Sequence, residues 1–383
     1  MLMNSLLAIG LMSGTSADGI DAALVETEGL APPVARAFRE TPYPPGIRRA
    51  VLALMAPGPG EIDALGALHR ALGDLFAEAA LGVCAMAGVD PAEVAVIGSH
   101  GQTIRHRPPV FTLQIGDPHR IAALTGIPVV GDFRPADVAR GGQGAPLTPL
   151  FHRCLFAQPG IATAVLNLGG IANVTALPAD PDAPLAAGDS GPANSLLDLL
   201  AARVSDGAAS CDRDGKWASS GGVDESALAW LLAHPYLREP FPKSTGREAF
   251  GAAYLDEFLQ RFPNLPTENR FATLAEFTAR SAWEACLRLL PPRPDRVVLC
   301  GGGVRNPDLM ARFHRLGPDC AWMESAALGV DAGSLEAQAF AWFAVRTMRG
   351  LPSSLPEATG AREPAVLGSI HAAPGRRWPF LSP

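Results

Sequence analysis

The chain has 383 residues, of which 48% are hydrophobic and 18% are charged, a composition typical of a folded globular protein and not of a disordered one. Its formal net charge of −7 argues against a general affinity for nucleic acid or for an anionic membrane surface. The length exceeds what one hydrophobic core usually fills, so two domains are expected. An anionic substrate would have to be bound by local donors.

Cysteine and lysine usage narrows the class of protein further. The six cysteines are scattered without a CxxC pair, which disfavours a zinc site or a disulfide framework and predicts reduced thiols in a cytoplasmic protein. No apolar run approaches the roughly 18 residues of a membrane helix, and the N-terminal stretch lacks the features of a signal peptide. The chain carries only two lysines, Lys216 and Lys243, and no GxxxxGK[ST] phosphate loop.

The chain begins with a predicted strand, a polar turn and a second strand. Leu6–Met12 and Ile20–Thr27 are the apolar-rich arms, and small polar residues crowd the turn between them. Backbone N–H groups and small hydroxyls in such a hairpin can cradle a phosphate. Asp18 and Asp21 would then lie within reach of a metal that bridges the phosphates. An ordinary glycine-containing hairpin is the alternative interpretation.

Helical spacing of apolar residues predicts a long helix over 62–87, and short strands are expected over 94–98, 111–115 and 127–130. His100 and Gln102 follow the first of these strands. His100 and His106 could be metal ligands, but no third ligand has suitable spacing, so a polar cleft wall is the preferred interpretation. Residues 131–144, which include Arg134, form a loop rich in charge and glycine, as cleft-lining loops often are.

The second half repeats the opening pattern. Strands at Ala162–Leu168 and Ile171–Leu177 flank Gly169 and Gly170, which indicates a weak internal duplication of two α/β lobes. A further strand is expected over 296–300 and an irregular, packed tail from about 351. Helices are predicted over 195–204, 225–233, 249–262, 272–290 and 334–348.

Three features of the second half point to chemistry. Asp189, in GDSGPAN, is predicted to project an ionised carboxylate into a cleft and to act as a general base, with helix capping as the alternative. Gly301–Gly303 lie between a strand and a helix that Asn306 is predicted to cap, an arrangement that suits a nucleotide or, alternatively, tight strand–helix packing. Glu336 lies in a helical first turn, where the helix dipole alone would favour a carboxylate.

Taken together, these segments resemble, in order and spacing, the anhydro-N-acetylmuramic acid kinases. The resemblance extends from about Ile9 to Leu367 and rests on GLMSGTSADGID, GSHGQTIRHRP, LQIGDP, VVGDFRPADVARGGQGAPLTP, LNLGGIANVT, GDSGPANSLLD, STGREAF and CGGGVRNPDLM. It implies an α/β fold of two RNase-H-like lobes of the actin/hexokinase/heat-shock-ATPase type, with the active-site cleft between them. We expect residues 1–131 with 349–383 in the first lobe and 132–348 in the second.

The resemblance also implies an activity. ATP and water would convert 1,6-anhydro-N-acetylmuramate to N-acetylmuramate 6-phosphate and ADP, a step of peptidoglycan recycling in the cytoplasm, with Mg²⁺ as cofactor. The expected partners are ATP and this small-molecule substrate, without nucleic acid or membrane. The oligomeric state is left open, a homodimer included.

The resemblance implies a role for each motif residue. Asp189 matches the catalytic base, and Asp18 and Asp21 are the expected metal ligands. The predicted substrate-site residues are His100, Gln102, Arg134 and Glu336. The predicted nucleotide-binding residues are the phosphate loop Gly14, Thr15, Ser16, Ala17, Asp18, Gly19, Ile20 and Asp21, together with Gly169, Gly170, Gly301, Gly302, Gly303 and Asn306.

Two residues depart from the family pattern. Ala193 stands where a glycine is common, which would cause strain if its φ were positive, and Ala249 replaces an aromatic residue. Two alternative functions are also open: a kinase for a plain anhydro sugar such as levoglucosan, and a non-catalytic nucleotide-switch protein of the same superfamily. Asp189 favours catalysis over the second alternative.

Overall fold

The computed structural model describes residues 4–14, 16–55 and 57–375. By its contacts the chain divides into two compact units, the first made of Met1–Leu155 with Gly333–Pro383 and the second of Phe156–Ala332. These boundaries differ from those expected from the sequence, because 132–155 and 333–348 lie with the first unit. None of the helices in the described ranges is both long and apolar enough to span a membrane.

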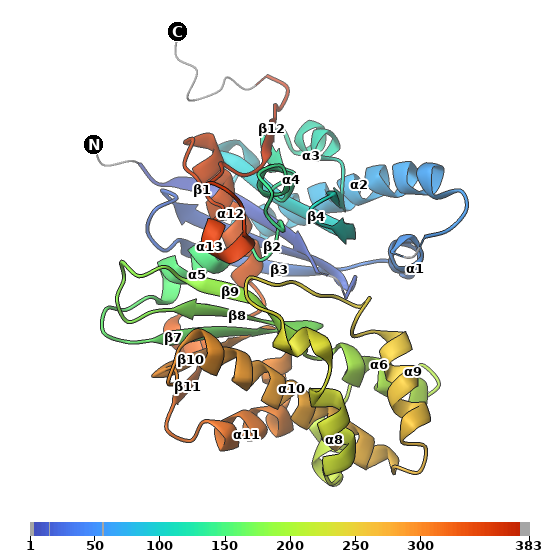
Figure 1. Cartoon of the computed structure of the whole chain (residues 1–383). Helices are drawn as coiled ribbons and strands as arrows, with labels where there is room; N and C mark the ends of the chain where they lie inside the picture. The colour runs from blue at the N-terminus through green and yellow to red at the C-terminus, as the bar shows by residue number, and fades with distance from the viewer. Residues whose placement is uncertain (1–3, 15, 56, 376–383) are drawn as a thin grey trace. The chain divides into compact units, whose positions relative to one another are not determined.

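The described part of the first unit contains a seven-stranded sheet of order β12-β6-β4-β1-β2-β3, with β5 paired to β4 (Figure 1). β1, β2 and β3 form an antiparallel meander, and β4 runs parallel to β1. The strands are β1 Leu6–Ser13, β2 Gly19–Thr27, β3 Val34–Pro42, β4 Val96–Arg107, β5 Phe111–Ile115, β6 Val129–Gly131 and β12 Ser369–His371. The helices are α1 Pro45–Leu54, α2 Glu61–Ala87, α3 Pro118–Thr125, α4 Pro135–Val138, α5 Pro149–Phe156, α12 Leu335–Met348 and α13 Pro356–Thr359.

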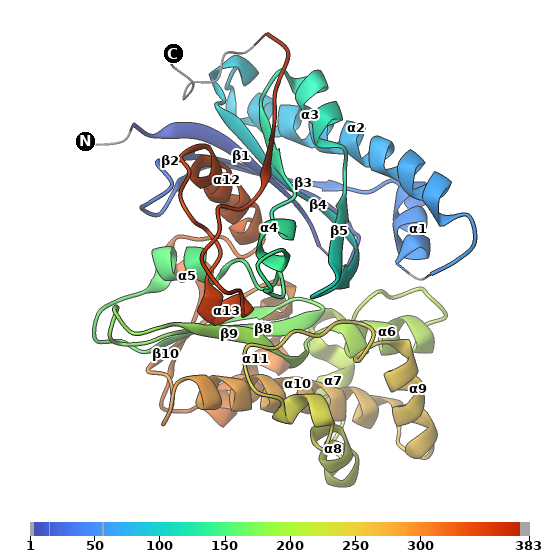
Figure 2. The ribbon, with the colours of Figure 1, turned by 45° about the horizontal axis from the view of Figure 1, so that its top comes forward.

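Helices α2 and α12 pack against this sheet (Figure 2). Ile9 and Leu11 of β1 belong to the buried cluster that contains α2 residues. Gly10 lies between them and faces the other way, because successive strand residues alternate between faces. A Cβ on Gly10 would lie 1.7 Å from the carbonyl oxygen of Ala337 in α12. Helix α12 therefore rests directly on the strand backbone, which is why 333–348 joins the first unit.

In the second unit, described throughout, five strands have the order β11-β10-β7-β8-β9. They are β7 Thr163–Leu168, β8 Ile171–Leu177, β9 Ala186–Pro192, β10 Arg296–Cys300 and β11 Ala321–Glu324. The α-helices are α6 Ser195–Val204, α7 Lys216–Ser220, α8 Glu225–Leu232, α9 Ala252–Arg261, α10 Thr267–Leu289 and α11 Pro307–Leu316. Helix α10 contributes to two buried clusters, one with the strands and one with the other helices.

The internal duplication expected from the two hairpins is confirmed. In each unit an antiparallel meander of three strands is followed by strands that extend the sheet in parallel from the first strand of the meander. The order β6-β4-β1-β2-β3 thus corresponds to β11-β10-β7-β8-β9. The hairpins β1–β2 and β7–β8 occupy equivalent places in the two units.

Several element predictions need correction. The strand expected to end at residue 98 continues to Arg107, because its polar half forms a hairpin with β5. Strand β3 was not predicted, since as an exposed edge strand it lacks apolar alternation. Helices α1 and α3 were also missed, and the tail expected to be irregular contains α13 and β12.

Candidate active site

The first hairpin, between β1 and β2, is held by a buried glutamine of β4. The hydroxyl oxygen of Ser13 lies 2.7 Å from the carbonyl oxygen of Gly19 and 2.7 Å from Oε1 of Gln102. Gln102 donates its amide to the carbonyl oxygen of Gly14 at 3.1 Å and is fully buried. Gln102, predicted at the substrate site, therefore supports the β1 end of the hairpin, and Ser13 links it to Gly19 at the β2 end.

The turn itself has an unusual backbone. Ala17 is buried and adopts a left-handed conformation with φ of 54°, which is costly for a residue with a side chain. Gly19 is required for space, since a Cβ would lie 2.4 Å from the carbonyl oxygen of Thr41, whereas Gly14 has no such obstruction. Ser16 is exposed, and Thr15 lies outside the described residues.

The two predicted metal ligands come from this hairpin. The Asp18 carboxylate is mostly exposed and lies 3.4 Å from Arg48, and Asp21 at the start of β2, beside the buried Ile20, is half-buried. Among the described residues, no group of three or more His, Cys, Asp or Glu side chains could hold a metal. The two carboxylates offer the oxygen donors that Mg²⁺ prefers, and this ion usually keeps several water or phosphate ligands. The donor set therefore fits a magnesium ion bound together with a nucleotide.

The buried His100 and the half-buried Arg134 form a pair in the first unit. Arg134 donates from Nε to Nε2 of His100 at 2.9 Å, and Nδ1 of His100 lies 2.9 Å from the carbonyl oxygen of Gly101. A guanidinium has no acceptor, so Nε2 must carry the lone pair and Nδ1 the proton. Burial, and after it the charge of Arg134, lowers the pKa of His100 well below 6.5. His100 is therefore neutral at physiological pH.

Helix α12 brings Glu336 to the same place. Burial raises the pKa of Glu336, and the charge of Arg134 opposes this rise, so the two groups lie within electrostatic reach. Phe340, one turn further along the helix, has its ring centroid 4.7 Å from that of His100. The first unit thus brings together three of the four predicted substrate residues.

The loop after β6 is fixed by a buried carboxylate that the sequence did not single out. Asp137 is fully buried and accepts hydrogen bonds from the N–H of Gly144 and the hydroxyl of Thr359, both at 2.7 Å. Arg134 in turn donates from Nη1 to the carbonyl oxygen of Gly144 at 2.6 Å. An aspartate within a glycine-rich loop is the sequence signal that could have pointed to this support.

In the second unit, Asp189 lies within strand β9 and pairs with Asn173 of β8. The helix-capping alternative is wrong, because Asn194 is the N-terminal cap residue of α6. The Asp189 carboxylate is oriented by a neighbour distant in sequence: Oδ2 accepts a hydrogen bond from the backbone N–H of Thr245 at 2.8 Å. The STGRE segment, which a solvated helix start could have explained, thus holds the predicted base.

The second hairpin is tied to the entrance of α6. The carbonyl oxygen of Gly169 accepts from the backbone N–H and the side-chain amide of Asn194, at 3.0 and 2.8 Å. The carbonyl oxygen of Gly170 accepts from the N–H of Ala193 at 2.9 Å. Ala193 is absent from the described non-glycine residues with positive φ, so the strain considered from the sequence does not arise. Ala249 is half-buried beside the helical cluster of this unit.

The three glycines after β10 differ in what they contact. A Cβ on Gly301 would lie 2.3 Å from Oδ1 of Asn167, and one on Gly303 would lie 2.6 Å from Cβ of Leu168. These two glycines are required by tight packing against the end of β7, the alternative weighed above. Gly302 is less obstructed, with Arg305 the nearest group at 3.6 Å. A nucleotide contact of these glycines stays a prediction.

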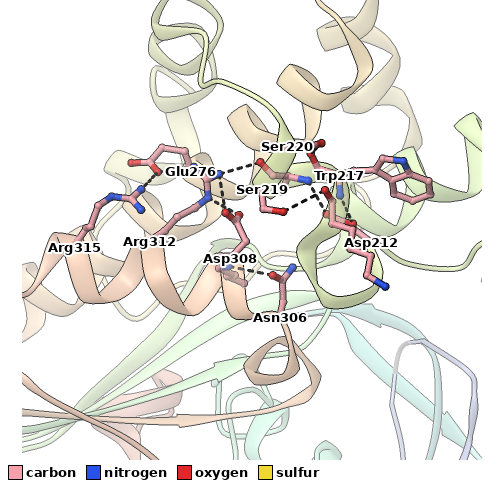
Figure 3. Close-up of polar contacts among 12 residues, drawn as sticks. Asp212, Trp217, Ser219, Ser220, Glu276, Asn306, Asp308, Arg312 and Arg315 are labelled. Atoms are coloured by element: carbon pink, nitrogen blue, oxygen red, sulfur yellow. Dashed lines mark hydrogen bonds and ion pairs between the residues drawn. The ribbon is translucent and has the colours of Figure 1, made fainter.

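Asn306 caps α11 as predicted, because its Oδ1 accepts from the N–H of Leu309 at 3.1 Å. Beside this cap lies an ion-pair network, formed by Glu276 of α10 with Asp308 and Arg312 of α11 (Figure 3). Burial raises the pKa of Glu276, but its bonds to Arg280 and Arg312 outweigh this effect and lower the pKa overall. The network joins α10 and α11 close to the cap residue Asn306.

The class of protein follows from the repeated topology. Two α/β units with the same strand order, each opening with a glycine-turned hairpin, are the RNase-H-like lobes of the actin/hexokinase class. Within this class, a sequence model of the anhydro-N-acetylmuramic acid kinase family matches residues 6–373, and the chain belongs to this family. It is accordingly an enzyme of the kinase type.

Similar proteins were found both by sequence and by structure. An anhydro-N-acetylmuramic acid kinase of Shewanella amazonensis is 45% identical over 370 residues, covering 96% of this chain and 99% of the relative. One from Shewanella sp. strain MR-4 is also 45% identical, covering 97% and 100%. A solved ROK family glucokinase from Streptomyces griseus in complex with glucose and AMPPNP is 14% identical, covering 88% of this chain and 99% of that chain, with a TM-score of 0.40.

Proposed function

We propose that this kinase converts 1,6-anhydro-N-acetylmuramate, ATP and water to N-acetylmuramate 6-phosphate and ADP. Family membership and the 45% identity to curated relatives of that name support the substrate. The observation that carries the reaction type is the carboxylate of Asp189, oriented by the Thr245 N–H on strand β9. A non-catalytic nucleotide switch has no need of such a base.

The chemistry of the substrate demands a base. An anhydro sugar has no free 6-hydroxyl, so a kinase that acts at O6 must open the 1,6 bridge. Asp189 takes a proton from water as the water oxygen bonds to C1, as the base carboxylate does in inverting glycosidases. The C1–O6 bond breaks, and O6 bonds to the γ-phosphorus of ATP as ADP leaves. The water oxygen becomes the anomeric hydroxyl.

Arg134 is suited to bind the lactyl carboxylate that distinguishes the muramyl sugar. Its contacts with His100 and the carbonyl oxygen of Gly144 are with neutral acceptors, so neither cancels its positive charge. Guanidinium and carboxylate groups bind each other in a planar, bidentate geometry. This local positive charge offsets the negative net charge of the chain. Glu336 lies within electrostatic reach of Arg134 and would line the same substrate pocket.

The hairpin 13–21 is suited to bind the phosphates of ATP. Small residues let its backbone amides approach the phosphate oxygens closely. Asp18 and Asp21 would hold Mg²⁺, which when bound neutralises phosphate charge during transfer. Positioning of the γ-phosphate is the main contribution that phosphoryl transfer requires from a protein.

An assay of ADP release tests this function. The purified chain is supplied with ATP and anhydro-N-acetylmuramate, with ATP and levoglucosan, or with ATP alone. We expect rapid ADP release only with the muramyl sugar. Equal rates with both sugars would support a general anhydro-sugar kinase, and slow release independent of sugar would support a nucleotide switch.

A further inference from the structure

Lys243 is one of only two lysines in the chain and is 5% exposed. Its ammonium donates to the carbonyl oxygens of Tyr236 and Leu237, at 2.7 and 3.2 Å. It also lies 4.2 Å from the ring centroid of Tyr236 and 5.0 Å from that of Phe241. No ion pair of Lys243 is seen within the described residues, so its charge is met by carbonyl oxygens and aromatic faces. Burying a lysine in this way is costly, which calls for a compensating role.

The two segments that Lys243 joins are the same two that hold Asp189. The hydroxyl of Tyr236 donates to the carbonyl oxygen of Asp189 at 2.9 Å, and the N–H of Asp189 donates to the carbonyl oxygen of Lys243 at 2.9 Å. Thr245, two residues further on, donates to the carboxylate. The segment 241–245 packs closely against β9, because a Cβ on Gly188 would lie 2.6 Å from the Phe241 ring. Backbone and carboxylate of Asp189 are thus fixed by residues 236–245.

We propose that Lys243 is a positioning residue for the Asp189 carboxylate, because its ammonium fastens the turn at 236–237 to the segment 241–245 and so fixes both groups that orient Asp189. The inference rests on the proposed function of Asp189 as the base. Small displacements of a catalytic group cost rate: a shift of about 1 Å can reduce turnover by about 100-fold. Hydrogen bonds from an ammonium are stronger than those from a neutral amine. The orientation of Asp189 therefore depends on the protonation of Lys243.

The charged and titratable groups around Lys243 are Arg288 on α10, Asp189 on β9, and Tyr236 and Glu239 in the turn that precedes Lys243. Burial, and after it the charge of Arg288 on α10, lowers the pKa of Lys243 to about 8, while Glu239 and Asp189 oppose this change. The remaining neighbour is Tyr236, whose pKa is raised by burial and, second, by the charge of Asp189, so that its hydroxyl stays protonated. Lys243 is thus the group of this cluster expected to lose its proton at mildly alkaline pH, and turnover should fall there.

The test compares variants by steady-state kinetics between pH 6 and 10. Lys243→Met keeps the apolar stem and removes the ammonium, and Lys216→Met removes the only other lysine, which is exposed and paired with Asp214. We expect kcat of Lys243→Met to fall by about 10- to 100-fold at pH 7, with KM for ATP within about twofold. The decline of kcat above pH 8 should be lost in Lys243→Met and retained in Lys216→Met.

Tyr236→Phe keeps the test decisive if Lys243→Met does not fold, since it removes a single hydroxyl. It should lower kcat in the same direction without changing KM for ATP. Labelling lysine with ¹³C at the ε-carbon adds a readout in the wild-type protein, where one of two signals should titrate with the same midpoint as kcat. The inference is overturned if the midpoint of the NMR titration differs by more than one pH unit from the midpoint of the decline in kcat. It is also overturned by a folded Lys243→Met, or a Tyr236→Phe, with wild-type kcat.

The Asp189→Asn variant distinguishes a failure of this inference from a failure of the proposed role of Asp189 as the base. If Asp189→Asn keeps its turnover, the proposed base is wrong, whatever Lys243 does. If Asp189→Asn is inactive while Lys243→Met matches Lys216→Met at every pH, the base stands and the positioning role of Lys243 is overturned. Both the base and the positioning role are supported by a third outcome. In it, Asp189→Asn is inactive, and Lys243→Met keeps a reduced turnover that no longer declines at alkaline pH.

Discussion

Asp189 can be changed with little effect on its surroundings, because asparagine has the same shape and its amide oxygen can still accept from the Thr245 N–H. Asp189→Asn removes the negative charge and with it the capacity to take a proton. We expect turnover to fall by roughly 10²–10⁴, the usual contribution of a general base, while ATP affinity measured by calorimetry stays within about twofold. Asp182→Asn, at an exposed carboxylate of the same unit, is the matched control. More than half of wild-type turnover in Asp189→Asn would refute the assignment.

Arg134 should discriminate the muramyl substrate from sugars without a lactyl acid. Arg134→Ala is expected to weaken binding of anhydro-N-acetylmuramate by roughly 2–4 kcal/mol, the scale for truncating one partner of a buried charge pair. Binding of levoglucosan, measured by the same titration, should change little. Arg140→Ala in the same loop is the control, because Arg140 pairs with the exposed Glu363. Equal losses for both sugars would assign Arg134 a structural or nucleotide role.

For single residues, the sequence predicted which residues belong to the site better than it predicted what they contact. Asp189 and Arg134 were singled out by their motifs, and their placement in a strand and beside His100 came from the structure. Thr245 and Lys243 were not connected with Asp189, because they lie more than fifty residues away along the chain. Backbone hydrogen bonds between such distant segments leave no local pattern in side chains.

Among the elements, helix α12 decides how the first unit is built. A Cβ on Gly98 of β4 would lie 2.0 Å from the carbonyl oxygen of Phe340, which is backbone and cannot turn away. Gly98→Ala should therefore lower the free energy of unfolding by about 1–3 kcal/mol or more in chemical denaturation. Gly66→Ala in helix α2 is the control, since nothing lies within 4 Å of its Cβ and alanine favours a helix. Equal stability of the two variants would contradict this packing.

The ion-pair network between α10 and α11 should make the free energy of unfolding depend on pH. The folded pKa of Glu276 is lowered, so its ion pairs stabilise the protein above the unfolded pKa of about 4.5 and lose effect as the pH falls through the folded value. Glu276→Gln should lower the free energy of unfolding at pH 7 by about 1.5–3 kcal/mol, because Arg312 loses one of its two carboxylate partners and keeps only Asp308. Denaturation at pH 7 and pH 3 should show the difference between wild type and variant shrinking. A constant difference would contradict the role of this charge.

Element predictions succeeded where apolar periodicity was strong. The long helix α2 and the hairpin strands β7 and β8 lie within one residue of expectation. The predicted strand was shorter than β4, because His100, Gln102 and the residues after them are polar. Strand β5 pairs with β4 from Gln102 onward. Buried polar residues break the apolar pattern by which strands are recognised.

For the whole molecule, the duplication was visible in the sequence and the division into units was not. The two glycine-turned hairpins indicated two related α/β lobes, and the shared strand order confirms them. The division differs because α12 follows the second unit in the chain but packs on Gly10 and Gly98 of the first. Return of the chain to an earlier sheet depends on long-range packing, which periodicity does not report.

We propose that water, activated by Asp189, opens the anhydro bridge while O6 takes the phosphoryl group. Reaction in ¹⁸O-water, followed by mass spectrometry and NMR of the product, tests it most directly. We predict one ¹⁸O atom at the anomeric oxygen, none in the phosphate, and a single anomer inverted at C1 before mutarotation. Label in the phosphate of the sugar product, or bridge opening without ATP, would contradict the mechanism.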